Sequence, residues 1–398
     1  MVAILTECWL ATNWHIAIRS TRIEPVRYNL VRYWFNLLRS LRLADSAHVP
    51  IHKSTPPADT PVPVRRHTLL TWLCWLYVIV LVVIAVGMPF LGGVWWPATL
   101  LLYAPRFLLG LPLLILLPWA LAVHRRLLIL LGIGLFVLCD PIMGWCWPPL
   151  FRSDVTSSEG RQLTVLTCNI YSNAVSPNTW NTLLQQTKPD VIGLQESASN
   201  WRQYVPDGWH AVRQGSIVLA SRFPLQETAY SASELETWSY VDAVCGSIEV
   251  DGDTVQLAVV HLISPQHAIR DVLDRETGID TKNIGNMNDK MTRRRLESRR
   301  VADWVSQRAH RPLIVMGDFN LAAESRIYHE SWSWLTNAFS RVGSGFGYTK
   351  QTPLGPLEFG TRIDHILCNE QVSVRTCQVQ DDVGSDHLPV VAKVVIQP

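Results

Sequence analysis

The sequence has little charge, and that charge is unevenly distributed. Only 17% of the 398 residues are charged, and this low charge together with 17 tryptophans excludes a disordered or collagen-like chain. The net charge is +5 for residues 1–67, +2 for residues 68–150 and −5 for residues 151–398. The nearly uncharged middle excludes an ordinary soluble protein. The acidic C-terminal segment lacks the excess of positive charge that binds long nucleic acid.

Cysteine is also sparse, and no two cysteines form a CxxC pair. The eight cysteines therefore predict no zinc site. Cys368 and Cys377 could pair in an oxidising compartment, but a disulfide scaffold normally has denser cysteine, which favours buried free thiols. The first 20 residues lack a basic start followed by a small-residue cleavage site, so we expect no cleavable signal peptide.

Residues 68–145 are predicted to form a membrane anchor of three transmembrane helices. Residues 68–90 run for 23 residues without a charge, which is enough to cross about 30 Å of hydrocarbon as a helix. Two further apolar runs, Phe107–Val123 and Leu127–Met143, are at the short end of the spanning range. The alternative is a buried hairpin of core helices, which the scarcity of charge between the three runs disfavours.

Residues 1–67 are predicted to be a basic head on the cytoplasmic side. Residues 29–43 place apolar side chains on one helical face, as expected for a helix on the membrane surface or one packed on another protein, and residues 44–64 resemble a proline-rich linker. Lys and Arg are concentrated in this head and at Arg125–Arg126 after the second run, so the positive-inside rule places both in the cytoplasm. Three crossings predict a multi-pass plasma (inner) membrane protein whose C-terminal domain is periplasmic or extracellular.

Residues 160–398 are predicted to form an α/β domain with large sheets faced by helices, because short β-branched runs alternate with helical stretches. Helices are expected at Pro177–Thr187 and Thr292–Ala309. Strands are expected at Leu163–Cys168, Val191–Gln195, Ser216–Ala220, Tyr240–Val250, Val255–His261, Leu313–Met316, Ile363–Leu367 and Val390–Ile396.

Six groups of polar residues stand at or near the ends of these apolar runs. Each pair alone is commonly a turn or a helix cap, but six in one domain predict carboxylates, amides and imidazoles around one small volume. They are Asn169, Gln195-Glu196, His261, Gly317-Asp318-Phe319-Asn320, Arg362-Ile363-Asp364-His365 and Ser385-Asp386-His387.

The order of these motifs resembles the endonuclease/exonuclease/phosphatase superfamily, also called deoxyribonuclease I-like. The resemblance rests on Asn169, Gln195-Glu196, His261, GDFN at 317–320, RIDHIL at 362–367 and GSDHLP at 384–389. It covers about residues 160–398 and implies a four-layer α/β sandwich, with two mixed sheets packed face to face and helices outside. It also implies Mg²⁺-dependent hydrolysis of a phosphoric ester or anhydride.

Such hydrolysis needs a cation, an activated water and donors for the phosphoryl oxygens. Glu196 offers hard oxygens suited to Mg²⁺ or Mn²⁺, and the resemblance implies that Asn169 and Asp386 complete or support that metal site. The resemblance further implies that Asp318 orients or deprotonates the attacking water. Asn320 would donate its amide to the phosphate.

The imidazoles have separate expected roles. By the same resemblance, His387 holds a phosphoryl oxygen while Asp364 fixes its tautomer, and His261 fits a second imidazole position. A lone His261 would more often be a satisfied core histidine, but the neighbouring motifs favour the site. Two positions differ from the abasic-endonuclease branch of the family. Some nucleases of the family carry a carboxylate at the position of Tyr171 and may use tyrosine at the position of His261, so both residues disfavour that branch. His365 is expected to be a strand residue.

Two loops have alternative interpretations. Residues 270–300 carry Arg293–Arg295 and Arg299–Arg300, which predict either a solvated helix face or a basic wall for a diphosphate or anionic headgroups. Residues 344–360, rich in glycine and proline, could be a mobile rim over the site or a connector.

These observations favour a membrane-anchored phosphohydrolase acting outside the cytoplasm on a lipid or lipid-linked phosphate. A tether of about ten residues, 150–160, would raise the effective concentration of lipid headgroups at the site. Three spans before this domain resemble the layout of teicoplanin-resistance membrane proteins, which implies a polyprenyl diphosphate as one candidate substrate. The alternatives are an extracytoplasmic nuclease acting on DNA or RNA and a catalytically inactive tethered scaffold. Membrane lipids and the phosphorylated substrate are the expected partners, with no obligate protein partner.

Overall fold

The computed structural model describes residues 64–147, 160–233, 240–273 and 280–397. The described residues from Leu70 onward form one compact unit. The predicted surface helix at 29–43 and the proline-rich linker lie outside the described residues, as does most of the predicted connection at 150–160.

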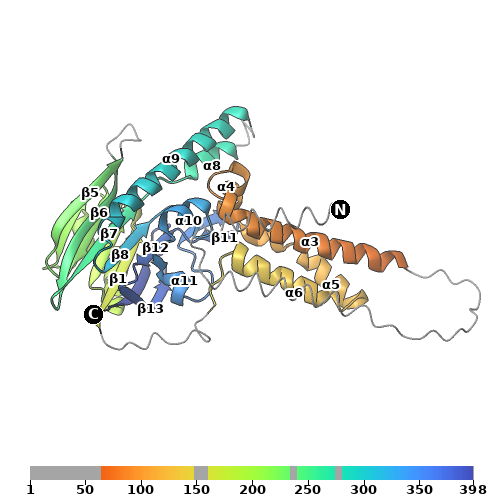
Figure 1. Cartoon of the computed structure of the whole chain (residues 1–398), viewed down its shortest axis with the longest axis horizontal. Helices are drawn as coiled ribbons and strands as arrows, with labels where there is room; N and C mark the ends of the chain where they lie inside the picture. Colours follow the sequence, from red (N-terminus) through yellow and green to blue (C-terminus); the bar gives the residue numbers. More distant parts are fainter. Residues whose placement is uncertain (1–63, 148–159, 234–239, 274–279, 398) are drawn as a thin grey trace, which may run out of the picture. The chain divides into compact units, whose positions relative to one another are not determined.

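Apolar helices make up the first described part of the chain (Figure 1). Two segments are long and apolar enough to cross a membrane, Thr68–Leu91 and Arg106–Val123. The third expected span is a shorter helix, Leu127–Ile142, so the structure does not show three spans. This helix starts after the Arg125–Arg126 turn and stops before Gly144, whose φ of 78° breaks it. The elements are α3 (Val64–Leu91), α4 (Trp96–Tyr103), the 3₁₀ turn η1 (Arg106–Gly110), α5 (Leu113–Val123), α6 (Leu127–Val137) and the π-helical turn η2 (Leu138–Ile142).

Two six-stranded mixed sheets form the centre of the remaining chain, as the sequence predicted. The first sheet has the order β13-β14-β1-β2-β4-β3, with β13 (Val372–Val379), β14 (Val390–Ile396), β1 (Arg161–Asn169), β2 (Val191–Gln195), β4 (Ile217–Ser221) and β3 (His210–Gln214). The second has the order β5-β6-β7-β8-β12-β9, with β5 (Gln226–Ser233), β6 (Tyr240–Val250), β7 (Asp253–His261), β8 (Leu313–Asp318), β12 (Asp364–Cys368) and β9 (Thr336–Asn337). A separate hairpin pairs β10 (Lys350–Leu354) with β11 (Leu357–Thr361).

Alternating side chains on the strands build four layers. Val165 of β1 and Met316 of β8 belong to the cluster between the sheets. Their neighbours point outward: Leu166 packs against the helix α7 (Pro177–Thr187), and Val315 packs on the far side of the second sheet. The outer layer there contains α9 (Thr281–Ser306) and α10 (Arg326–Trp332), with α8 (Gln266–Val272) beside α9 (Figure 1). The remaining elements are η3 (Tyr171–Asn173), η4 (Trp201–Tyr204) and α11 (Ala338–Val342). The α/β sandwich is confirmed.

The apolar helices share a core with the sandwich loops. Leu81 of α3, Leu131 of α6 and Ile142 of η2 belong to a buried cluster that also contains Ala322, four residues after β8. Cys368 and Cys377 are buried free thiols, as the low cysteine density indicated.

Candidate active site

Sheet topology brings the predicted residues to one edge of the sandwich. β1 and β2 run parallel, so Asn169 lies in register with Gln195, next to Glu196. In the second sheet, Asp318 lies in register with His261 on one side and Asp364 on the other. His387 precedes β14, which is antiparallel to β1. Strand ends that meet at the same edge therefore collect side chains from six segments of sequence.

The glycine of the GDFN motif is required by the close approach of two strands. Gly317 has a φ of 140°, which side chains rarely adopt. A Cβ atom there would lie 2.0 Å from the carbonyl oxygen of Val260 on β7. Only glycine lets β8 end with Asp318 beside His261.

Asn169 links two carboxylates across the sheets. Its Nδ2 donates to Glu196 Oε1 at 2.9 Å and to Asp318 Oδ2 at 3.0 Å. Its Oδ1 accepts from the backbone N–H of Tyr171 at 3.0 Å, which fixes the orientation of the amide. Glu196 has a φ of 53°, and its side chain is 33% exposed while that of Asp318 is 1% exposed. Glu196 is thus the accessible carboxylate of the pair.

Two imidazoles flank Asp318. His261 Nε2 lies 3.6 Å from Glu196 Oε1 and 3.8 Å from Asp318 Oδ2. His387 Nε2 lies 3.8 Å from the same Asp318 oxygen. Asp318 Oδ2 is therefore the atom around which the predicted groups converge.

Asp364 and His387 form a buried carboxylate–imidazole pair. His387 Nδ1 lies 2.9 Å from Asp364 Oδ2 and 3.1 Å from Oδ1, which leaves Nε2 directed toward Asp318. Thr349 Oγ1 accepts from the backbone N–H groups of Ile363 and Asp364, both at 3.1 Å, and holds the start of β12. The expected pairing is thus present.

The charges in this group oppose one another. Burial raises the pKa of Asp318, as does the negative charge of Asp364, against the effect of His387 and His261. Burial also opposes ionisation of Asp364, but the hydrogen-bonded His387 outweighs it and lowers the pKa of Asp364. Burial alone would lower the pKa of His387, whereas Asp364 and Asp318 raise it to about 9. At neutral pH a protonated His387 lies between two carboxylates, of which Asp318 takes up a proton more readily.

Asn320 is held by contacts that the sequence did not reveal. Its Nδ2 donates to Leu262 O at 2.9 Å and to Asp318 Oδ2 at 3.2 Å. Its carbonyl oxygen accepts from Tyr103 Oη at 2.7 Å and from Arg294 Nη2. Arg294 Nη2 also donates to Tyr103 Oη at 3.0 Å. Tyr103 belongs to α4 and Arg294 to α9, so both the apolar segment and the long helix hold this loop.

Four arginines of α9 are held by groups on other elements rather than forming a basic wall. Arg294 is buried, and Arg295 makes two hydrogen bonds of 2.6 Å to Glu330. Arg299 Nη2 also donates to Glu330, at 3.1 Å, and Arg300 pairs with Asp242. A run of arginines in sequence does not show which of them lie against carboxylates of other elements.

Asp386 is placed differently from the other predicted metal ligands. Its Oδ2 pairs with Lys350 Nζ, and its Oδ1 is buried without a hydrogen-bond partner among the described residues. His387 Nε2 lies 4.0 Å from that Oδ1. The structure places Asp386 beside the site but pairs it with a lysine that the sequence did not single out.

His365 and Ser385 have contacts within the protein. His365 Nε2 lies 2.8 Å from Leu321 O, and burial lowers the pKa of this imidazole to about 4, which suits the expected strand residue. Ser385 Oγ donates to Asn169 O at 2.7 Å and accepts from the N–H of His387 at 3.2 Å, so it ties the SDH loop to β1.

The donor atoms fit a hard divalent cation. Glu196, His261 and Asp318 each offer one ligand atom, and these atoms lie within 4.8 Å of one another. Asp318, Asp364 and His387 form a second such group, but the last two already bond to each other. The group around Glu196 is therefore the better candidate cation site, with Glu196 as its accessible carboxylate and the amide of Asn169 beside it.

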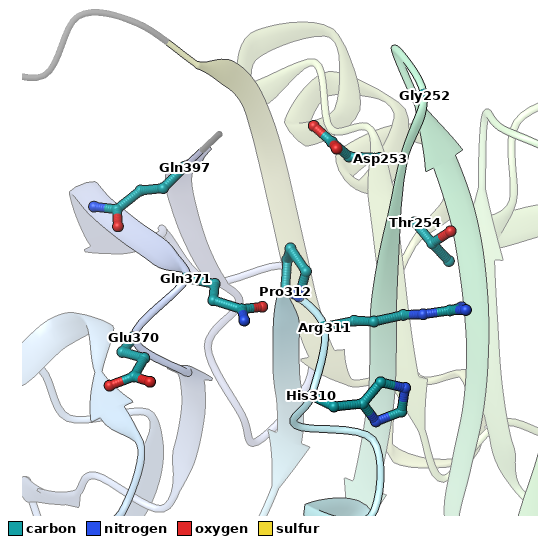
Figure 2. A pocket seen from close by; sticks show the side chains of 9 residues that line it. All are labelled: Gly252, Asp253, Thr254, His310, Arg311, Pro312, Glu370, Gln371 and Gln397. Carbon is teal, nitrogen blue, oxygen red and sulfur yellow. The ribbon is translucent and has the colours of Figure 1, made fainter.

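A separate surface cavity lies at the opposite end of the strands (Figure 2). Its volume is about 630 Å³, and it is lined around Asp253 at the start of β7, Pro312 before β8 and Gln371 before β13. None of the predicted site residues lines it. Because His261 and Asp318 lie at the other ends of β7 and β8, this cavity is distinct from the candidate active site.

Comparison with known families agrees with this arrangement. A profile of the Endonuclease/Exonuclease/phosphatase family matches residues 166–387, more than half of the chain. The chain belongs to this family. Its fold and membership define a hydrolase of phosphate esters.

Solved structures with similar folds cover about the same part of the chain. An endonuclease/exonuclease/phosphatase family protein from Bacteroides thetaiotaomicron is 16% identical, covering 60% of this chain and 100% of its own, with a TM-score of 0.45. A 3'-5' exonuclease from Neisseria meningitidis is 19% identical over 59% of this chain and 100% of its own, with a TM-score of 0.43. A mannosyl-6-phosphatase from Bacteroides thetaiotaomicron is 16% identical over 59% and 100%, with a TM-score of 0.44. Curated proteins gave no significant sequence match.

Proposed function

We propose that this chain is a membrane-anchored, metal-dependent phosphohydrolase that acts on a lipid or lipid-linked phosphate. The observation that carries the proposal is the 2.7 Å hydrogen bond from Tyr103 Oη to Asn320 O, which joins the apolar helical segment to the loop of the GDFN motif. An active-site loop attached to apolar helices lies close to any bilayer that contains those helices. The phosphate of a lipid headgroup in that bilayer would then lie close to the active-site loop.

Exposed apolar side chains support membrane insertion. Trp72 on α3, Leu114 and Ile115 on α5, and Ile129 on α6 are between 69% and 73% exposed. Soluble monomers rarely expose contiguous apolar surface of this kind, whereas a lipid environment favours it. Two of the segments are also long and apolar enough to span.

The chain's own residues divide the chemistry. Asp318 Oδ2 accepts the proton of the attacking water, because its raised pKa makes it the more basic of the two buried carboxylates. His387 Nε2 donates to a phosphoryl oxygen while Asp364 holds Nδ1, and the Asn320 amide keeps Asp318 oriented. His261 lies on the other side of Asp318 and is positioned to donate to the leaving group.

Glu196, supported by Asn169 and Asp386, would hold Mg²⁺ or Mn²⁺, and this leaves Asp318 and His261 free for proton transfer beside it. When bound, the cation supplies positive charge to the phosphoryl oxygens. Asp386 would contribute from its buried Oδ1.

The orientation of the chain is tested by fusions after residue 398. We propose a plasma or inner membrane location with the catalytic domain on the periplasmic or outer side, because Arg and Lys concentrate in residues 1–67 and at Arg125–Arg126. An alkaline phosphatase fusion should be active, and a green fluorescent protein fusion should be dark. The opposite pair of results would place the site in the cytoplasm.

A phosphate-release assay of the full chain with Mg²⁺ tests the activity. The panel contains a polyprenyl diphosphate, phospholipid, an inositol phosphate and DNA, with Asp318→Asn as the inactive control. The highest kcat/KM is expected for the lipid-linked substrates. Preferential cleavage of DNA would overturn the lipid proposal in favour of a nuclease.

A further inference from the structure

A small cavity lies where the apolar helices meet the β10–β11 hairpin. Its volume is about 310 Å³, at the lower end of the ~300–1,000 Å³ range of small-molecule sites. The residues that line it are Arg106, Phe107, Met143, Tyr348, Gln351, Glu358, Phe359 and Gly360. We call it the hairpin cavity.

The walls of the hairpin cavity suit an apolar occupant. Arg106 Nη1 donates to Ile142 O at 2.6 Å and pairs with Glu324 at 3.2 Å, so its charge is already neutralised. Tyr348 Oη donates to Met143 O at 3.3 Å. Arg106 and Tyr348 thus have partners within the protein, Gln351 and Glu358 are exposed, and Phe107, Met143 and Phe359 supply the apolar surface.

The cavity lies at the ends of the apolar segments. Phe107 is the second residue of the apolar segment Arg106–Val123, and Met143 directly follows Leu127–Ile142. Aromatic rings gather beside Met143: Trp145 packs edge-to-face on Phe346 at 4.8 Å, and Trp147 stacks on Phe136 at 6.1 Å. Tryptophans at the ends of apolar helices are typical of the bilayer–water boundary.

The tip of the hairpin is apolar where a soluble turn would be polar. Leu354 and Leu357 pair across the turn and are 39% and 56% exposed, and only Gly355 and Pro356 separate them. Exposed leucines beside the ends of apolar helices are suited to contact with lipid chains.

The base of the same hairpin contacts residues of the candidate active site. Lys350 pairs with Asp386, and the N–H of Gln351 donates to Asp386 O at 3.2 Å. Thr349 accepts from the N–H of Asp364. Residues 348–351 therefore contribute to the hairpin cavity through Tyr348 and Gln351 and to the active site through Thr349 and Lys350.

We infer that the hairpin cavity is a lateral binding site for the first part of an apolar chain whose phosphate occupies the active site. The inference rests on the proposed function and names how that substrate is held. The remainder of the chain continues past Leu354 and Leu357 into the bilayer. The site thereby selects lipid-linked over water-soluble phosphates.

The kinetic test uses the full chain in detergent with Mg²⁺ and two substrates, a long-chain polyprenyl diphosphate and the short, water-soluble isopentenyl diphosphate. Met143→Gln, which keeps the side-chain length but places an amide in the cavity, should lower the ratio of long-chain to short-chain kcat/KM roughly ten-fold through a higher KM. Leu354→Gln/Leu357→Gln should act in the same direction. Met143→Leu and the exposed α9 substitution Leu296→Gln are the controls and should keep the ratio. An unchanged ratio in Met143→Gln overturns the inference even if the long-chain substrate is hydrolysed.

A second measurement does not depend on turnover. A polyprenyl phosphate with a photoreactive diazirine in its first isoprene unit is cross-linked to the full chain, and the adducts are mapped by peptide. Adducts on Phe107, Met143 and residues 348–360 are expected. Adducts confined to lipid-facing residues such as Leu114 and Ile129 overturn the cavity assignment. Cavity adducts without hydrolysis of any lipid-linked phosphate would retain the binding site and reject the proposed activity.

Discussion

The pairing of Asp364 with His387 gives the sharpest prediction about catalysis. Two hydrogen-bond distances of 2.9 and 3.1 Å join the carboxylate to Nδ1, and His387 Nε2 lies 3.8 Å from Asp318. Asp364 acts on the reaction only through the imidazole, so Asp364→Asn should matter only while His387 is present. This predicts strong energetic coupling between the two positions.

The size of the coupling follows from the electrostatics. The pKa of His387 is raised from 6.5 to about 9, a shift worth about 3 kcal/mol, and Asp364 is the largest favourable contribution. Replacing that charge by an amide should leave His387 less often protonated and less firmly oriented, and we expect this to slow the reaction roughly ten-fold. His387→Ala removes a preorganised donor and should cost ~10²–10³ in turnover.

The assay is single-turnover phosphate release at saturating Mg²⁺, with thermal melts to check folding. Asp364→Asn/His387→Ala should be little slower than His387→Ala alone, so the roughly ten-fold effect of Asp364→Asn should largely disappear when His387 is absent. Asp381→Asn, an exposed carboxylate in the preceding loop, is the matched control and should leave the rate unchanged. Losses that simply add in the double variant would refute the reasoning, because they would mean that Asp364 and His387 act separately.

Three other substitutions test metal binding and stability. Glu196→Gln should cut activity by orders of magnitude with partial recovery in excess Mn²⁺, and activity that is unchanged and survives EDTA would contradict the metal site. Glu324→Ala leaves Arg106 and Arg362 buried without their carboxylate, so it should destabilise the chain by about 3–5 kcal/mol in denaturant unfolding, compared with the exposed control Glu370→Ala. Burial raises the pKa of Glu297 to about 8 from 4.5, so the stability that it contributes is present below pH 4.5 and is lost as pH rises toward 8. The Tm of Glu297→Gln minus the Tm of the natural chain should therefore be more positive at pH 8 than at pH 5. An equal difference at both pH values would exclude a titrating Glu297.

Central strands could be predicted from the sequence because they are buried on both faces. The runs at Val191–Gln195, Tyr240–Val250 and Val390–Ile396 match β2, β6 and β14. Six strands were not predicted: four lie at the edges of the two large sheets, β3, β5, β9 and β13, and the other two, β10 and β11, form the separate hairpin. An edge strand such as Gln226–Ser233 carries polar residues and a register shift, so it leaves no continuous apolar run. The polar residues at the ends of central strands could be predicted as well, because each continuous apolar run also marks where its strand ends.

Contacts that depend on packing between distant elements could not be predicted. Tyr103 reaches Asn320 across 217 positions, and Lys350 meets Asp386 only because the hairpin folds over the rim. The start of α9 was also placed too late: the helix begins at Thr281 rather than Thr292, and Asp280 caps it through a 2.6 Å bond from the N–H of Asn283. Residues 281–291 have only three apolar side chains, Ile284, Met287 and Met291, so the helical period there is present but weak among the polar residues.

Buried ion pairs around Glu324 join the apolar segment to the loop after β8. Glu324, six residues after Asp318 at the end of β8, is buried between Arg106 of η1 and Arg362 of the RIDHIL motif. These two arginines lower the pKa of Glu324 even though burial opposes its ionisation. Removing the apolar segment would take Arg106 from Glu324 and Tyr103 from Asn320 in one step. The segment is therefore part of the framework that holds the loop of the GDFN motif, and we expect residues 160–398 alone to be less active than the full chain.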